Sequence, residues 1–202
     1  TFMGGFVAGE CWASVYEPSP SDYPFTPKYI DMLVAGGTGT ANFSVELYGL
    51  DGTDMTTASL LGEGLVTLTS SSSEWNRVTV SDLGMVLDPI VGGNIAVAVC
   101  HEDHDGFPSI GHDSSRDAGD RTYIWGDIDE ALMLAGESAI GMAWWSTDEM
   151  ALYDVAPIPI FLPDGFEIAP NGDWIMRACI EGSDITGNCE DSDPTSDDGG
   201  ES

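Results

Sequence analysis

Apolar and polar residues alternate with a period of two in several short stretches, as expected of strands that bury one face. The clearest stretch is 43–47, and turn-forming residues follow it at 51–54. Similar stretches predict further strands at 10–17, 29–34, 65–69, 75–80, 122–125 and 174–180.

The stretch 94–100 differs from these because it is apolar at every position after Asn94. Large residues such as Ile95 and Val97 alternate there with the small residues Ala96 and Ala98. A strand that is apolar on both sides belongs in the interior of a sheet with both faces covered. The small residues predict that a neighbouring segment comes close to its second face.

The strands are short, numerous and separated by Gly, Pro and Ser turns, which predicts an all-β fold. We expect an antiparallel, jelly-roll-like β-sandwich over residues 1–182. An insertion at about 127–171 departs from this pattern, and the Ala- and Leu-rich stretch 129–145 within it predicts a short helix or irregular structure. Residues 183–202 are acidic and lack bases, which predicts a tail or linker.

Composition limits the partners that this chain can have. It contains 35 Asp and Glu residues against 5 Lys and Arg residues, a net charge of −30. Such a chain repels phosphate backbones and anionic lipids, which argues against nucleic acid and membrane surfaces. No apolar run reaches the ~18 residues needed for a membrane span. The acidity fits general solubility, high salt or a calcium-rich setting.

The four cysteines, Cys11, Cys100, Cys179 and Cys189, include no C-x-x-C pair, which argues against a zinc ribbon or a redox centre. An even number of widely spaced cysteines favours two disulfides and a secreted or cell-surface location. Three connectivities are open, and Cys11–Cys100 with Cys179–Cys189 is favoured because the second pair closes a short loop. Free thiols in a cytosolic protein are the alternative. A chain that begins at Thr1 is expected of a processed mature protein.

Short motifs of the predicted strands and turns follow one another in a definite order. They are T-P-K-Y-I over 26–30, F-x-V-x-L-Y over 43–48, W-N-x-V-x-V over 75–80, G-G-N-I-A-V-A-V over 92–99, P-x-I-G-x-D-S over 108–114, R-x-Y-x-W over 121–125 and G-D-W-I-M-R-A over 172–178. Over roughly 26–181 the chain resembles the jelly-roll β-sandwich modules of secreted bacterial proteases, lipoproteins and surface proteins. The resemblance implies a non-catalytic extracellular module that accompanies an enzyme or an anchor.

All three histidines lie within 101–112, directly after the apolar stretch, so we place them in a loop at the edge of the sandwich. His101 and His104 offer nitrogens that suit zinc, copper or nickel, whereas Asp103 and Asp105 offer oxygens that suit calcium. The glutamate of an EF-hand is missing from this spacing. A calcium site, a transition-metal site and a solvated acidic loop without metal therefore stay open.

The aromatic residues suggest a second kind of site. Trp144 and Trp145 are adjacent, and neighbours on a strand point to opposite faces, so one of them is expected at the surface. Together with Tyr153 they are candidates for a platform that binds sugar rings, and packing of both tryptophans in the core is the alternative. The tryptophans of the strand motifs are predicted to be core residues: Trp75, Trp125 and Trp174.

The sequence favours a protein that is not an enzyme, because it has neither a G-x-S-x-G elbow nor an H-E-x-x-H motif. We expect an extracellular structural or adhesive module that associates with copies of itself, with calcium between the acidic surfaces. The alternative is a carbohydrate-binding module that recognises an extracellular polysaccharide. A metal-dependent hydrolase comes third.

Overall fold

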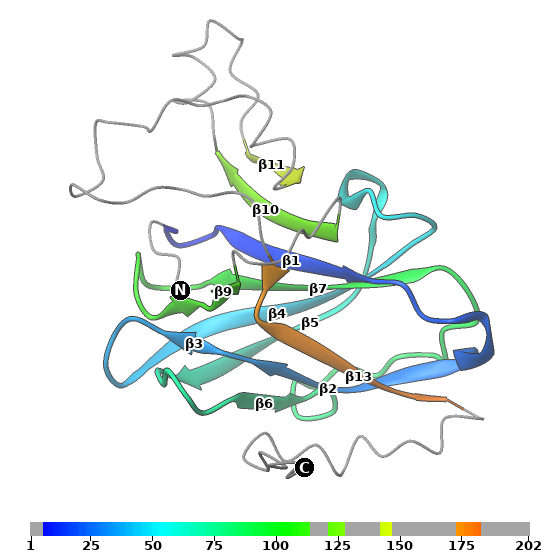
Figure 1. Cartoon of the computed structure of the whole chain (residues 1–202), viewed down its shortest axis with the longest axis horizontal. Helices are drawn as coiled ribbons and strands as arrows, with labels where there is room; N and C mark the ends of the chain where they lie inside the picture. Colours follow the sequence, from blue (N-terminus) through cyan, green and yellow to red (C-terminus); the bar gives the residue numbers. More distant parts are fainter. Residues whose placement is uncertain (1–5, 114–120, 128–141, 147–172, 183–202) are drawn as a thin grey trace, which may run out of the picture.

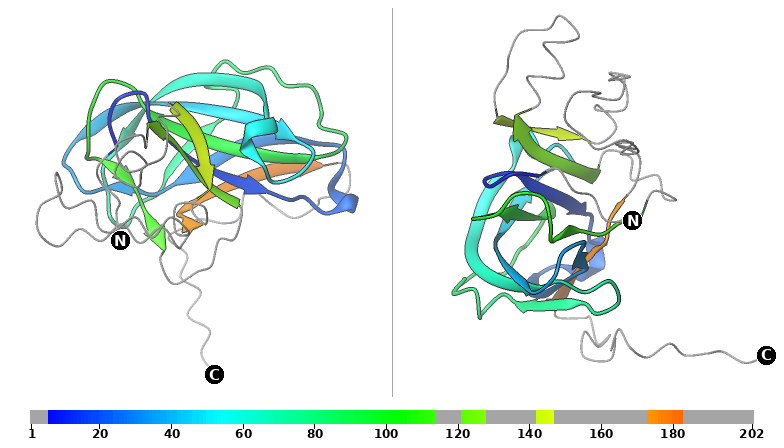
Figure 2. Two further views of the ribbon diagram at one scale, coloured as in Figure 1. Left: turned by 90° about the horizontal axis from the view of Figure 1, so that it is seen from above. Right: turned by 90° about the vertical axis from the view of Figure 1, so that its left-hand side faces the viewer.

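The computed structural model describes residues 6–113, 121–127, 142–146 and 173–182, and these ranges form an antiparallel β-sandwich (Figure 1). Two layers of strands face each other, as Figure 2 shows from two further directions. The all-β sandwich predicted from the short alternating segments is therefore confirmed. In the described part of the chain, the helical elements are the short 3-10 turns η1 (Pro20–Asp22) and η2 (Met55–Thr57).

The larger layer is a six-stranded sheet in which every pairing is antiparallel. Its strands bury alternate residues, which accounts for the period of two in the sequence. In spatial order they are β11 (Met142–Ser146), β10 (Thr122–Asp127), β1 (Cys11–Tyr16), β7 (Asn94–His101), β4 (Thr40–Leu50) and β5 (Ser59–Thr69).

The smaller layer is built around β2 (Phe25–Met32), which pairs with β13 (Met176–Gly182) on one side and with β6 (Asn76–Thr79) on the other. Figure 1 shows β13 and β2 running together across the front of the molecule. An ion pair between Arg77 and the buried Asp31 links β6 to β2, with N–O distances of 2.8 Å in both hydrogen bonds.

After β2 ends at Met32 and before β13 begins at Met176, the two segments separate, and the segment around Gly111 enters between them. The backbone N–H of Gly111 donates to Leu33, whose own N–H donates to Ile175, while Ile175 donates back to Gly111. This arrangement corrects the prediction that the three histidines of 101–112 lie in a loop, because Ser109–Ile110 and His112–Asp113 form strands. Strands of two residues are too short to show alternation in the sequence. These short strands are β3 (Val34–Ala35), β8 (Ser109–Ile110), β9 (His112–Asp113) and β12 (Asp173–Trp174).

The core lies between the two layers and is filled mainly by large side chains. Trp12 and Phe43 of the large sheet are fully buried, with ring centroids 5.7 Å apart in an edge-to-face arrangement. Ile30 and Met32 of β2 join the same buried cluster from the smaller layer. Trp174 is also buried, as predicted for a tryptophan of the strand motifs.

Both faces of β7 are buried, as predicted for the stretch 94–100. Val97 and Val99 face the core, whereas Ala96 and Ala98 belong to a second cluster on the outer face of the large sheet. Met55 of the η2 turn joins that cluster and is 2% exposed. The small alanines thus allow the β4–β5 connection to close over the sheet.

A disulfide joins Cys11 on β1 to Cys100 on β7, and the two residues are directly opposite each other in the strand register. This pair is the one that the sequence favours. Cys179 is also disulfide-bonded. Its expected partner, Cys189, lies outside the described residues.

The predicted insertion at 127–171 is described only in part. Residues 142–146 form β11, a strand at the edge of the large sheet, which corrects the helical prediction for the end of the stretch 129–145. The sequence favoured a helix because its Ala and Leu residues are good helix formers, but pairing with β10 overrides that local preference. The remainder of the insertion, at 128–141 and 147–172, and the acidic tail at 183–202 lie outside the described residues.

Candidate functional site

The outer face of the large sheet carries a pocket of about 340 Å³. It lies beside the second hydrophobic cluster, and residues of five neighbouring strands, β11, β10, β1, β7 and β4, line it because outward-facing residues of paired strands form rows across a sheet. The lining residues are Gly9, Cys11, Ser44, Glu46, Tyr48, Cys100, His101, Glu102, Trp125 and Trp144.

The floor of the pocket is one such row. Trp125 is paired with Cys11, Cys11 with Cys100, and Cys100 with Ser44, so these residues follow one another from β10 to β4. The disulfide stands at the centre of this row. It fixes the two middle strands covalently under the pocket, so the side chains on either side keep their spacing.

Three half-buried aromatic side chains form one wall. The ring centroids of Trp125 and Trp144 lie 5.5 Å apart at an interplanar angle of 55°. Tyr48 meets Trp144 edge to face, with centroids 6.1 Å apart. Trp144 also packs against the second hydrophobic cluster, which holds the wall against the sheet.

Two carboxylates also line the pocket. Glu46 is half-buried on β4, and its Oε2 accepts a hydrogen bond of 2.6 Å from the Tyr48 hydroxyl. Burial, this hydrogen bond and the negative charges of Glu46 and Glu63 raise the pKa of Tyr48 above its usual range, so the hydroxyl remains a donor. Glu102 is exposed and stands just beyond the end of β7.

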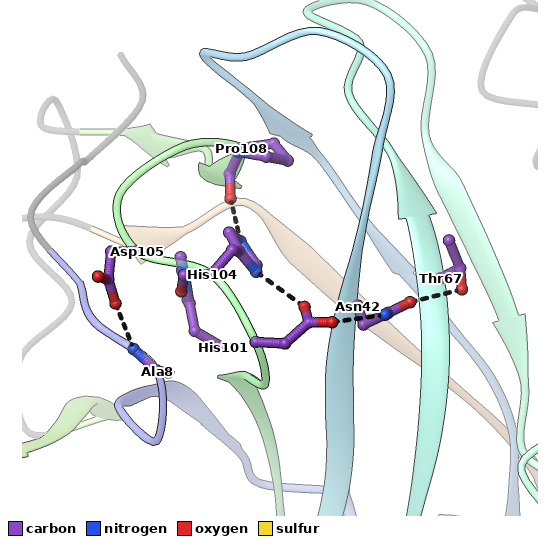
Figure 3. A network of polar contacts seen from close by, with 8 residues as sticks. Ala8, Asn42, Thr67, His101, His104, Asp105 and Pro108 are labelled. Carbon is purple, nitrogen blue, oxygen red and sulfur yellow. Dashed lines mark hydrogen bonds and ion pairs between the residues drawn. The ribbon is translucent and has the colours of Figure 1, made fainter.

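Of the four residues predicted to bind a metal, His101 ends β7 and also lines the pocket, whereas Asp103, His104 and Asp105 lie in the loop that follows. Figure 3 shows His101, His104 and Asp105. His101 is 1% exposed and packs among the rings of Phe6, Trp12 and Phe43. Its Nδ1 lies 3.3 Å from the His104 carbonyl oxygen, to which it can only donate. The two imidazole rings are stacked, with centroids 4.3 Å apart.

Burial, reinforced by the nearby His104, lowers the pKa of His101 from 6.5 to about 4. The His104 carbonyl and the Asp105 carboxylate oppose this shift without cancelling it. His101 is therefore neutral near neutral pH. Its Nε2 is buried and finds no hydrogen-bond partner among the residues that the structure describes.

The two aspartates of the loop point to different partners. Asp103 accepts a hydrogen bond of 2.9 Å from Asn42 on β4, and Asp105 accepts one of 3.0 Å from the backbone of Ala8. His104 Nε2 lies 3.1 Å from the Pro108 carbonyl oxygen. These contacts tie the loop to β4 and to the N-terminal segment.

These side chains do not converge on one point in the described part of the chain. There, the group of His, Cys, Asp and Glu residues whose ligand atoms lie within 4.8 Å of one another is Cys11, Glu46 and Cys100. The two sulfurs of this group form the disulfide, so neither is available as a thiolate ligand. The geometry thus gives no added support to a metal at either place, and calcium binding stays a prediction from the sequence.

The aromatic residues predicted as a sugar platform also do not lie together in the described part of the chain. Trp144 is half-buried and lines the pocket, whereas Trp145 is 8% exposed on the opposite side of β11. Tyr153 lies outside the described residues. Sequence reasoning missed Trp125, which was predicted to be a core residue. The signal that could have found it is the alternation along β10: Ile124 packs against the core opposite the buried Trp12, so its neighbour Trp125 faces outward.

Among the residues that the structure describes, no helix has the length and apolar character needed to cross a bilayer. Comparisons with protein-family models, with curated proteins and with solved structures give no match to this chain.

Proposed function

We propose that this chain is a non-catalytic extracellular module that binds carbohydrate in the pocket on the outer face of its large sheet. The observation that carries the proposal is the set of half-buried rings, Tyr48, Trp125 and Trp144, standing beside the carboxylate of Glu46. Sugar rings present both C–H faces and hydroxyl groups, and this pocket offers a complement to each.

The chemistry of the walls supports a sugar over an entirely apolar ligand. Aromatic rings give large contact areas to the C–H faces of a pyranose. Glu46 and Glu102 can accept hydrogen bonds from its hydroxyls, and Ser44 adds a further polar group. A volume of about 340 Å³ is at the small end of ligand sites and suits a single unit of a polysaccharide.

The disulfide between Cys11 and Cys100 supports an extracellular location, because such bonds persist in oxidising compartments. The bond also accounts for the shape of the site, since it forms the pocket floor. A rigid floor lowers the entropy lost when a ligand is held, which favours binding over an induced rearrangement.

Titration calorimetry with neutral and amino-sugar oligosaccharides, together with polysaccharide affinity columns, tests this proposal. Trp144→Ala should weaken binding to the retained glycan at least tenfold, because it removes the central ring of the wall. Trp75→Ala is the matched control, since Trp75 is half-buried under Arg177 near β6 in the other layer. Equal losses in both variants, or no binding to any glycan by the wild-type chain, contradict the proposal.

Sedimentation of the same samples distinguishes this function from self-assembly. The edge strand β5 exposes Leu60 and Leu65, which are 51% and 72% exposed, so contact between copies along this edge is the competing hypothesis. A carbohydrate-binding module should stay monomeric while it is retained on the glycan column. Oligomers or filaments that depend on calcium, without glycan retention, favour the self-assembling subunit instead.

A further inference from the structure

The pocket is negatively charged, and the Lys and Arg side chains of the described residues lie elsewhere. No Lys or Arg is among its lining residues, whereas Glu46 and Glu102 both are. Each base in the described ranges is already engaged. Lys28 pairs with Glu181, Arg77 with Asp31, Arg121 with Glu17, and Arg177 lies over the Trp75 ring.

A third carboxylate increases this charge. Glu63 on β5 is directly opposite Glu46 on β4 in the strand register, so both side chains project from the outer face. Like charges in directly opposed cross-strand positions destabilise a sheet. No Lys or Arg among the described residues offsets the negative charge of Glu46 and Glu63. Such a local conflict in an otherwise consistent fold is expected where a ligand supplies the missing charge.

The aromatic wall stands beside these acids. Tyr48 links the two features, because it donates to Glu46 and meets Trp144 edge to face. A cation over an aromatic face is attracted by the ring quadrupole. An ammonium group that also donates to a carboxylate forms the stronger, charge-assisted kind of hydrogen bond. One protonated amine placed between Glu46 and the wall would use both.

We propose that the sugar unit held in this pocket carries a protonated amine, so that the ligand class is a polymer of unacetylated amino sugars. This inference rests on the proposed carbohydrate-binding function and names its substrate. A neutral sugar would leave Glu46 and Glu63 without a counter-charge, and an acidic sugar would be repelled. The amine is expected to donate to Glu46 while the ring packs on Trp144.

The test compares a glucosamine oligomer with the N-acetylglucosamine oligomer of equal length by titration calorimetry in about 150 mM salt. Acetylation removes the charge and keeps the ring. We expect the glucosamine oligomer to bind at least tenfold more tightly. The isosteric variant Glu46→Gln should lose about tenfold of that affinity. The control Asp88→Asn removes one charge from an exposed loop between β6 and β7 and should bind like wild type.

Each other outcome overturns a definite part of the proposal. Equal affinity for both oligomers overturns the amine and leaves carbohydrate binding intact, whereas binding of neither oligomer nor any neutral glycan overturns both. An oligolysine of equal charge that binds as tightly as the glucosamine oligomer overturns the sugar. Equal losses in Glu46→Gln and Asp88→Asn overturn a specific site, because they indicate attraction to the net charge of −30. Calorimetry needs folded variants, so thermal melting of each variant accompanies the titrations.

Discussion

His101 is a polar residue in an aromatic environment, and only its neutral form suits that environment. It contacts Phe6, Trp12 and Phe43, and its Nδ1 satisfies the His104 carbonyl oxygen. Protonation would place a charge on Nε2, which has no hydrogen-bond partner among the described residues. The ring therefore couples the stability of the fold to pH.

The sign of this coupling follows from the pKa of His101, which falls from 6.5 to about 4 on folding. The unfolded chain binds more protons between these values, so the stabilisation is present above about pH 6.5 and is lost as the pH falls towards 4. Urea unfolding should show a loss of about 2 kcal/mol between pH 7 and pH 5. His101→Leu should lose distinctly less over this range, since the buried imidazole is then absent. Equal losses in the two proteins contradict this assignment.

In β7, the small residues of the outer face set how closely other segments approach the sheet. Ala98 is fully buried between Ala13 on β1 and Glu46 on β4. Ala98→Leu would add three carbon atoms to a packed site, which typically costs about 1–3 kcal/mol. Urea unfolding measures this loss. Ser59→Leu, at an exposed position of β5, should change stability by less than about 0.5 kcal/mol. Similar values for both variants would show that the outer face of β7 is not tightly packed.

The longer strands were predictable because apolar and polar residues alternate in a strand that buries one face. This holds for β4 and β10, and the two-sided burial of β7 followed from the lack of polar residues at 95–100. Strands such as β8 and β12 were not predictable, because two residues carry no period and their partners are far away in sequence. Trp125 was not predicted as a pocket residue for a related reason. Trp144 was a candidate from its adjacency to Trp145, but the position of Trp125 depends on its pairing with Cys11.

The whole molecule carries a net charge of −30, which folding brings onto a compact surface. A folded chain of this mass exposes roughly 9,000 Å², so the excess charges lie about 17 Å apart. One such pair repels by about 0.2 kcal/mol in unscreened water. The Debye length shortens from ~30 Å at about 10 mM salt to ~8 Å at about 150 mM, which removes most of this repulsion. The unfolded chain spreads the same charges further apart. Screening therefore lowers the free energy of the folded state more than that of the unfolded chain.

Thermal melting should therefore rise with sodium chloride. Between about 10 and 150 mM we expect an increase of at least roughly 4 °C, equivalent to 1–2 kcal/mol for a chain of this size. Calcium chloride at matched ionic strength separates screening from specific binding, since a ligand of the folded state adds RT ln(1 + [L]/Kd) on top of the screening effect. An additional rise with calcium that a chelator reverses would support the cation site predicted around Asp103 and Asp105. Identical curves in the two salts would assign the effect to screening alone, and a melting temperature independent of salt would contradict the electrostatic argument.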